Sequence, residues 1–565
     1  MILQITKNDK DVFELINFIA QHYPLHVTQP KRIKEVIDQI NFDNLTVIVE
    51  ENYIDKQYRD CYYSYYSQKY CYYERECVRL TFFDEKLDND DLIEKDDAYL
   101  TNHLVGTIVL RPLHIGNIGL TLLNPRKLKV DGYIRVAEYT FMTFGRKLCV
   151  SAFPFSSQDG DVMTCAENAL YNLINYYGTR YSDYRAFSPG EISSHLEVAT
   201  SERVFPSGGV RLLDLAKVLE RAHLYPTLYK YDQYEDSFDD IMISYCESGI
   251  PFLFAAFHHV VTCIGFEEIQ GDCQYEVSHF SKDNETYYLL SAAQFIKSNI
   301  FMDDNKYPYS KSTLKDLASE YYEFDDTDYE SENGDEENGP RNDPEERYIF
   351  TENTLANVDM KDVALIVPLH KRIYLEATHA REIFFTHFLL NKQFVTNIQK
   401  EYSDNTWGTQ ENNPLVYRFF LTTARNYKSF KREHEQSSDI RTNIILNPFP
   451  HFIWIMEIST SDLFKEKKGC VEIILDASSS FNSQENAILS IRYYNHYLFT
   501  PDIIELMNEP VPTSYSTPGL WDNMEKDFQN QALTTMFEVL YTDKNTNSNV
   551  SATFDMFSEY NLERM

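Results

Sequence analysis

The sequence lacks most of the motifs that identify common protein classes. Its 565 residues contain no CxxC pair, no P-loop, no GxGxxG motif and no internal repeat. No apolar stretch approaches the roughly 18 residues of a membrane-spanning helix. The first residues, "MILQITKNDKDVFELINF", lack the basic start, apolar run and small-residue cleavage site of a signal peptide. We therefore expect a protein of the cytoplasm.

Positive charge is scarce. The chain has 52 Lys and Arg against 87 Asp and Glu, which gives a formal net charge of −35 and a pI near 4.8. So acidic a surface repels nucleic-acid phosphates and anionic lipid headgroups, and we expect neither nucleic acid nor membrane as a partner. The hydrophobic fraction of 43% is nevertheless high enough for sizeable folded cores.

Cysteine is limited to nine residues, an odd number spread along the whole chain. This spread does not fit a disulfide framework. Cys61, Cys71 and Cys77 lie in one region but lack the close pairing of a zinc knuckle. We interpret them as buried or half-buried thiols, and the sequence predicts no metal or cofactor.

The pattern of apolar residues predicts an α+β protein with several regions. An N-terminal α/β region, 1–150, contains a helical pattern at 9–23. Strands are predicted where β-branched and aromatic residues gather, at 44–51, 76–84 and 104–113.

A central region, 151–322, is followed by an acidic linker or loop, 323–347, and by a C-terminal α/β or α+β region, 348–565. The stretch 323–346 has 12 acidic residues in 24, too polar to fold alone. In the C-terminal region we predict strands at 363–369, 451–457 and 470–477, and helices at 376–395 and 521–542.

The most informative stretch is "CAENALYNLINYYG", which begins at Cys165. Its apolar residues lie on one helical stripe, so a helix is predicted to begin near Cys165 and to stop at Gly178. A thiol at a helix N-terminus lies near the positive pole and unsatisfied N–H groups, which favour thiolate. Cys165 is therefore either a small apolar residue in a core helix or a nucleophile.

A thiolate nucleophile also requires a base, and "FHHVVTCIGF" offers two adjacent histidines in an apolar strand pattern. Neighbours in a strand face opposite sides, so one of His258 and His259 can face a cleft while the other is packed or solvated. Which of the two acts as base is left open by the residues themselves.

Together these stretches resemble the papain-like cysteine peptidases. The resemblance covers about 151–300 and is greatest to the bacterial branch that includes the double-glycine leader peptidases. In that family the nucleophilic cysteine opens a long helix, and the histidine begins a strand with a Gly-aromatic pair six and seven residues later. His259, Gly265 and Phe266 have this spacing. The resemblance implies Cys165 as nucleophile and His259 as general base and then acid.

The same resemblance implies two further roles. Gln158 and the backbone N–H of Cys165 would form the oxyanion hole, although the family places its glutamine six residues before the cysteine, where this chain has Asp159. Asp283, or alternatively Ser278, would orient the histidine.

Two functions remain open at this stage. One is a cysteine-dependent amide hydrolase of the cytoplasm, that is a peptidase, isopeptidase or deamidase with a peptide or protein substrate. The other is an inactive or weakly active papain-like scaffold that serves as a binding or regulatory protein, since a fold does not guarantee its chemistry. The sequence leaves the substrate and the oligomeric state open.

Overall fold

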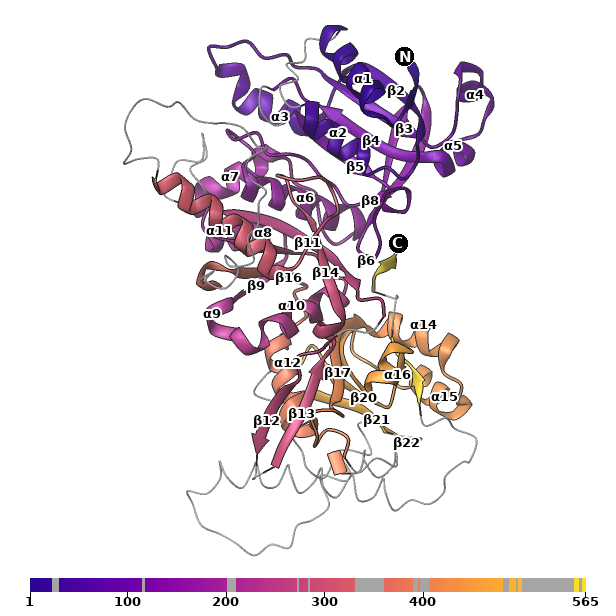
Figure 1. Cartoon of the computed structure of the whole chain (residues 1–565), viewed down its shortest axis with the longest axis vertical. Helices are drawn as coiled ribbons and strands as arrows, with labels where there is room; N and C mark the ends of the chain where they lie inside the picture. Colours follow the sequence, from indigo (N-terminus) through magenta and orange to yellow (C-terminus); the bar gives the residue numbers. More distant parts are fainter. Residues whose placement is uncertain are drawn as a thin grey trace, which may run out of the picture.

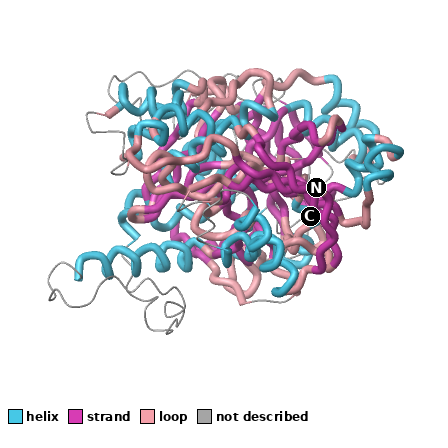
Figure 2. The backbone as a smooth tube through the Cα atoms, turned by 90° about the horizontal axis from the view of Figure 1, so that it is seen from above, coloured by secondary structure: helices cyan, strands magenta, loops and turns pink. Residues whose placement is uncertain are grey.

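The computed structural model is an elongated α+β molecule with three sheets placed one after another along its longest axis (Figure 1). Viewed along that axis, strands gather in the middle and helices lie mostly outside (Figure 2). The structure describes all residues except 23–29, 114–116, 201–209, 272–273, 283–284, 331–359, 390–394, 397–405, 481–486, 494–495, 500–552 and 558–560. Among the described helices, none is both long and apolar enough to cross a membrane.

The first sheet is an antiparallel meander of five strands in the order β1-β2-β3-β4-β5. Its strands are β1 (Ile2–Thr6), β2 (Asn44–Tyr53), β3 (Cys77–Phe83), β4 (Leu104–Leu110) and β5 (Ile118–Leu123). The helices of this part are α1 (Asp9–His22), α2 (Pro30–Asp38), α3 (Lys56–Ser64), α4 (Asn89–Glu94) and α5 (Asp97–His103). The predicted helix at 9–23 and the three predicted strands are therefore confirmed within a few residues.

The central sheet has eight strands, and every pairing in it is antiparallel. Six form the path β15 (Ser310–Ser312), β14 (Ile296–Met302), β11 (His259–Glu268), β10 (Phe252–Ala256), β16 (Ala364–Leu369) and β9 (Tyr225–Lys230). Two short strands, β6 (Tyr133–Ile134) and β24 (Glu563–Arg564), join beside β11. Directly after β6 in the sequence, β7 (Ala137–Thr143) and β8 (Arg146–Ala152) form a separate two-stranded hairpin.

Both faces of the central sheet are buried at the inner strands β10, β11 and β16, which explains why these strands are mostly apolar instead of alternating. Leu253 and Ala255 of β10 belong to a core shared with the N-terminal part, whereas Phe252 and Phe254 belong to a core shared with the C-terminal part. The helices associated with this sheet are α6 (Cys165–Arg180), α7 (Pro189–Ala199), α8 (Leu212–Arg221), α9 (Tyr231–Tyr234), α10 (Phe238–Glu247) and α11 (Leu314–Glu330).

The third sheet has seven strands and one parallel pairing, between β13 and β17. Its order is β12 (Ser278–Lys282), β13 (Glu285–Ser291), β17 (Leu415–Thr423), β18 (Phe452–Ser459), β20 (Val471–Asp476), β21 (Ile488–Tyr493) and β22 (His496–Phe499). The helices here are α12 (Ala377–Phe384), α14 (Ala424–His434), α15 (Ser438–Leu446) and α16 (Ser461–Lys465), and a separate two-stranded ribbon pairs β19 (Lys468–Gly469) with β23 (Phe554–Asp555).

The three sheets do not follow the linear division expected at residues 150, 322 and 348. β6 from the first region and β16 from the last belong to the central sheet, while β12 and β13 from the middle belong to the third sheet. The C-terminal end returns to the middle of the molecule, where β24 pairs with β6 (Figure 1). Long-range strand pairing of this kind has no local sequence signal.

The C-terminal predictions are partly tested by the structure. The strands expected at 363–369, 451–457 and 470–477 are β16, β18 and β20. The helix expected at 376–395 is α12, continued by a π-helical turn, Phe385–Leu389. The acidic stretch begins as helix, because α11 runs to Glu330, and its remainder lies outside the described residues, as does the helix expected at 521–542.

The α6 helix begins at Cys165 as expected, but it does not stop at Gly178. It continues to Arg180, and a Cβ on Gly178 would lie 2.3 Å from the backbone nitrogen of Ala186. The glycine therefore permits the close approach of a neighbouring segment and does not terminate the helix. Gly265 is required for a similar reason, since a Cβ there would meet the backbone oxygen of Tyr133 at 1.9 Å.

Candidate active site

Cys165 is the first residue of α6 and its side chain is half-buried. The preceding residue, Thr164, has extended backbone and provides no side-chain cap; its hydroxyl donates to the Glu167 carboxylate instead. Because Thr164 provides no cap, the N–H groups of the first turn point out of the helix end, next to the sulfur. The thiol lies 3.7 Å from the carbonyl oxygen of His258, toward which it donates.

His259 opens β11 directly after a tight turn from β10, in which Ala256 and His259 are paired. Phe257 in that turn has a φ of 53°, a left-handed conformation that is unfavourable for a bulky residue. Its ring packs edge-on against Tyr322 of α11, with ring centroids 5.2 Å apart, which holds the turn in place. His258 is exposed and His259 is 7% exposed, so the two neighbours do face different environments, as strand geometry predicts.

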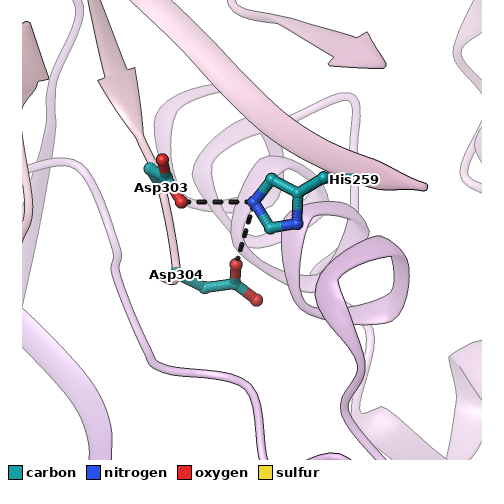
Figure 3. Close-up of side chains that lie close together, drawn as sticks. All are labelled: His259, Asp303 and Asp304. Atoms are coloured by element: carbon teal, nitrogen blue, oxygen red, sulfur yellow. Dashed lines mark hydrogen bonds and ion pairs between the residues drawn. The ribbon is translucent and has the colours of Figure 1, made fainter. Parts of the chain in front are cut away.

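Two carboxylates lie against the same nitrogen of His259. Asp303 and Asp304 follow directly after β14, the strand that pairs with β11. The His259 Nε2 atom is 3.2 Å from an oxygen of Asp303 and 3.5 Å from an oxygen of Asp304 (Figure 3). Nδ1 is the ring nitrogen that neither carboxylate contacts, and the Cys165 thiol is among the groups that act on the ring. The imidazole is thus influenced by a sulfur as well as by a carboxylate pair.

The carboxylates are themselves held from three sides. Tyr321 of α11 donates its hydroxyl to Asp303 at 2.6 Å, and its ring packs on the His259 ring with centroids 4.1 Å apart. The backbone N–H of Asn305 donates to the other oxygen of Asp303 at 3.0 Å. Asn168, one turn into α6, donates to Asp304 at 3.3 Å. The same helix that carries the thiol therefore also positions the second carboxylate.

Burial and charge act in opposite directions on these groups. Burial alone would lower the pKa of His259, but the hydrogen bonds with Asp303 and Cys165 and the nearby negative charges raise it well above its ordinary value. Burial would raise the pKa of Asp303, but the bonded imidazole lowers it to about 2. For Asp304, burial dominates and the pKa rises to about 6 despite the nearby imidazole. An ionised Asp303 is thus paired with a protonated ring at neutral pH.

Gln158 lies beside this cluster, because its side-chain amide donates to the Asn305 side chain at 2.7 Å. Asp159 stands where the family has glutamine, and its side chain points into the loop formed by the residues that follow it. One of its oxygens accepts the backbone N–H groups of Asp161, Val162 and Met163, at 2.8 to 3.0 Å. This closed loop, with Gly160 at a φ of 76°, accommodates the additional residue between Gln158 and the helix.

The expected orienting residue, Asp283, lies outside the described residues. Its alternative, Ser278, opens β12 in the seven-stranded sheet, whereas His259 belongs to the central sheet. The carboxylate that bonds His259 is Asp303, which sequence reasoning did not select. The one available signal was the pair Asp303–Asp304 in "FMDDNKY", directly after an apolar strand-like run. Recognising it required knowing that this strand is the neighbour of β11.

The same three side chains also have the chemistry and the spacing of metal ligands. One ligand atom each from His259, Asp303 and Asp304 lie within 4.8 Å of one another, and all three residues are buried. Imidazole and carboxylate oxygen are ligands of Zn²⁺ and similar ions. Each of the two carboxylates contacts the Nε2 atom of His259.

Comparison of the chain with models of known families, with curated proteins and with solved structures found no match. The arrangement of residues around Cys165 therefore provides the main basis for a functional proposal.

Proposed function

We propose that the protein is a cysteine-dependent amide hydrolase, acting on a peptide, isopeptide or side-chain amide. The observation that carries the proposal is that a thiol and a carboxylate both act on the buried His259 ring: Cys165, at the N-terminus of α6, is among the groups that raise its pKa, and Asp303 contacts its Nε2 atom. A nucleophile next to a base that a third group orients is the general arrangement of covalent catalysis. The central region would then have a papain-like organisation, as the resemblance implies.

In this mechanism the Cys165 thiolate attacks the amide carbonyl carbon and forms a C–S bond. The negative charge that develops on the carbonyl oxygen is stabilised by the backbone N–H of Cys165, with the Gln158 amide as second donor. His259, protonated on the ring, gives its proton to the departing amine as the C–N bond breaks. Water then attacks the thioester, His259 accepts a proton of that water, the C–S bond breaks, and the carboxylic acid is released as the Cys165 thiolate and the protonated His259 are restored.

Asp303 has a positioning role in this scheme. Its carboxylate on Nε2 orients the ring and stabilises the imidazolium, and the hydroxyl of Tyr321 and the N–H of Asn305 hold the carboxylate in turn. A solvated thiol would react slowly near pH 6, since only the thiolate is nucleophilic. We therefore expect Cys165, beside this base, to react faster near pH 6 than cysteines without such a neighbour.

The test is competitive labelling of the folded chain with iodoacetamide at pH 6, followed by mass spectrometry of each cysteine. Cys165 is expected to react on the order of 10²-fold faster than Cys149, which is also half-buried and serves as the internal reference. His259→Ala should abolish this advantage. His258→Ala, the adjacent substitution at an exposed position, is the matched control and should retain it.

A second measurement separates catalysis from thiol reactivity. Incubation with a mixed peptide and casein substrate should give new N-termini or released ammonia, and Cys165→Ala should give none. Equal, slow labelling of Cys165 and Cys149 in the unaltered chain would overturn the proposal. That result would favour the papain-like scaffold without catalysis. Inhibition by the chelator EDTA with unaltered labelling would instead favour a metal at His259.

A further inference from the structure

The cluster at His259 contains one carboxylate more than the amide-hydrolase mechanism uses. Asp303 orients the ring, whereas Asp304 takes no part in the chemical steps. Asp304 is 5% exposed, and its Oδ1 atom accepts no hydrogen bond, although it lies 3.5 Å from Nε2 of His259 (Figure 3). A buried carboxylate oxygen without a donor is costly, so its position requires a separate explanation.

The distances around Nε2 fit metal ligands better than hydrogen-bonded ions. A charge-assisted N–H···O bond is typically ~2.7–2.9 Å long, and one N–H is directed at one oxygen. Nε2 lies 3.2 Å from Oδ1 of Asp303 and 3.5 Å from Oδ1 of Asp304. Ligand atoms that are each about 2.1 Å from a tetrahedral Zn²⁺ ion lie roughly 3.4 Å from one another. Both contacts therefore have the length of an edge of such a site.

The other oxygen of each carboxylate is held by a donor from a helix. Tyr321 of α11 donates to Oδ2 of Asp303 at 2.6 Å, and Asn168 of α6 donates to Oδ2 of Asp304 at 3.3 Å. These two bonds fix the carboxylates with their Oδ1 atoms toward Nε2. Hydrogen bonds from surrounding residues orient metal-binding carboxylates in the same way.

The charge and the chemistry of the set suit a divalent ion. Two carboxylates and a neutral imidazole carry a charge of −2. Lys306, 3.9 Å from Asp303, is bonded to Glu320 at 2.5 Å, and Arg32 donates to the backbone oxygens of Asp304 and Lys306. Mg²⁺ and Ca²⁺ prefer oxygen ligands alone, whereas imidazole together with carboxylate is a donor set of Zn²⁺.

We propose that His259, Asp303 and Asp304 bind a Zn²⁺ ion that switches the hydrolase off. The ion takes the place of the proton on Nε2, which is released to solvent, and a fourth position is open to water. The ring then carries a single proton, on Nδ1. It can accept neither the proton of the Cys165 thiol nor that of the hydrolytic water. This regulation rests on the proposed hydrolase function, whereas the binding of the ion does not.

Binding is measured with Co²⁺, which occupies Zn²⁺ sites and absorbs visible light when it is four-coordinate. The full chain with Cys165→Ala should show this absorption without a sulfur-to-cobalt charge-transfer band, because the thiol is not a ligand. Zn²⁺ should displace Co²⁺, and Mg²⁺ should not. Asp304→Asn should weaken Co²⁺ binding at least about tenfold. Asp161→Asn, which removes an acid of the loop before α6, is the matched control and should leave binding unchanged.

Regulation is measured as the rate at which iodoacetamide labels Cys165 at pH 7. Micromolar Zn²⁺ should slow this labelling about tenfold in the unaltered chain, because the ring no longer accepts the thiol proton, and EDTA should restore the rate. Each variant is compared with itself without metal. The effect of Zn²⁺ should disappear in Asp304→Asn and persist in Asp161→Asn.

Equal slowing by Zn²⁺ in Asp304→Asn and the unaltered chain would overturn the proposal, because the ion would then be bound by the thiol directly. Loss of the Co²⁺ absorption in Cys165→Ala would overturn it for the same reason, and so would equal Co²⁺ affinity with and without the Asp304 carboxylate. The hydrolase function is tested without metal, by comparison of Cys165 with Cys149. Failure of that function would leave Co²⁺ binding intact, so the two failures are distinguishable.

Discussion

Among the described residues, two clusters of buried charge invite comparison, one in each of the two larger sheets. The first is His259 with Asp303 and Asp304 at the end of the central sheet. The second is a row across the seven-stranded sheet, where Arg418 pairs in register with Glu457, Glu457 with Glu472, and Glu472 with Arg492. All of these residues are at least nine-tenths buried.

The second cluster is closer to balance. Arg418 donates to Glu457 at 2.7 Å and lies 3.5 Å from Glu247, Lys431 of α14 lies 2.5 Å from Glu472, and Glu435, which follows α14, bonds Arg492. Each cation therefore has a carboxylate partner. We interpret this row as a structural element, because its charges pair with one another and no thiol lies among them.

The first cluster is unbalanced and has access to a nucleophile. It contains two carboxylates for one imidazole, and the half-buried Cys165, at a helix N-terminus, is among the groups that act on that imidazole. The comparison teaches that buried charge by itself does not indicate a site. A surplus of buried charge beside a reactive, accessible atom does indicate a functional site, because the pKa values of catalytic groups are shifted by such surroundings. The substitutions below test this distinction.

The largest effect on stability is expected from Lys431→Met. Glu472 would lose its cationic partner in a sealed interior, which costs about 3–5 kcal/mol in comparable buried pairs. The measurement is the free energy of unfolding in urea. Labelling of Cys165 at pH 6 should be unchanged in the folded fraction. A loss of Cys165 reactivity would contradict the separation of the two clusters.

The next largest effect is expected from Asp304→Asn, and it depends on pH. A folded pKa of about 6 against an ordinary 3.8 means that the folded protein holds this proton more tightly than the unfolded chain. The resulting stability is present at low pH and is lost as pH rises from about 4 to about 6. The difference between a pKa of 3.8 and one of about 6 corresponds to about 3 kcal/mol of stability.

Asp304→Asn should therefore match the unaltered protein in stability near pH 3.5 and exceed it at pH 7, by up to about 3 kcal/mol. Urea unfolding at the two pH values provides the check. An equal difference at both pH values would show that Asp304 ionises normally.

A smaller effect is expected from Asp303→Ala, measured as the labelling rate of Cys165 at pH 6. Removal of the carboxylate on Nε2 lowers the pKa of His259 and frees the ring to rotate, so the rate should fall about 10- to 100-fold. Asp303→Asn keeps an oxygen in the same place and should remain within about tenfold of the unaltered protein. Equal loss in both variants would argue against a positioning role.

The smallest effect is expected from Tyr321→Phe. This change removes one hydrogen bond to an ionised carboxylate, worth about 1.5–3 kcal/mol, and retains the ring that packs on His259. A few-fold drop in Cys165 labelling is expected. Tyr322→Phe on the same helix is the control, and a drop of the same size there would assign the effect to helix packing.

Local signals predicted a large part of the elements. The start of α6 at Cys165 followed from apolar periodicity, as did three strands of the first sheet and the strands β16, β18 and β20, whereas the start of β11 at His259 was implied by the family resemblance. The orienting carboxylate did not follow. Asp303 is 44 residues beyond His259, and only the pairing of β14 with β11 brings it to the ring.

The sequence by itself determined the two chemical ends of the candidate site, a thiol at a helix start and an imidazole at a strand start, because both depend on patterns within about a dozen residues. It also determined the acidic character of the chain. Only the tertiary structure decided which carboxylate bonds the ring and how the three sheets exchange strands. These features depend on contacts between distant segments, which burial of apolar surface selects and which no local pattern encodes.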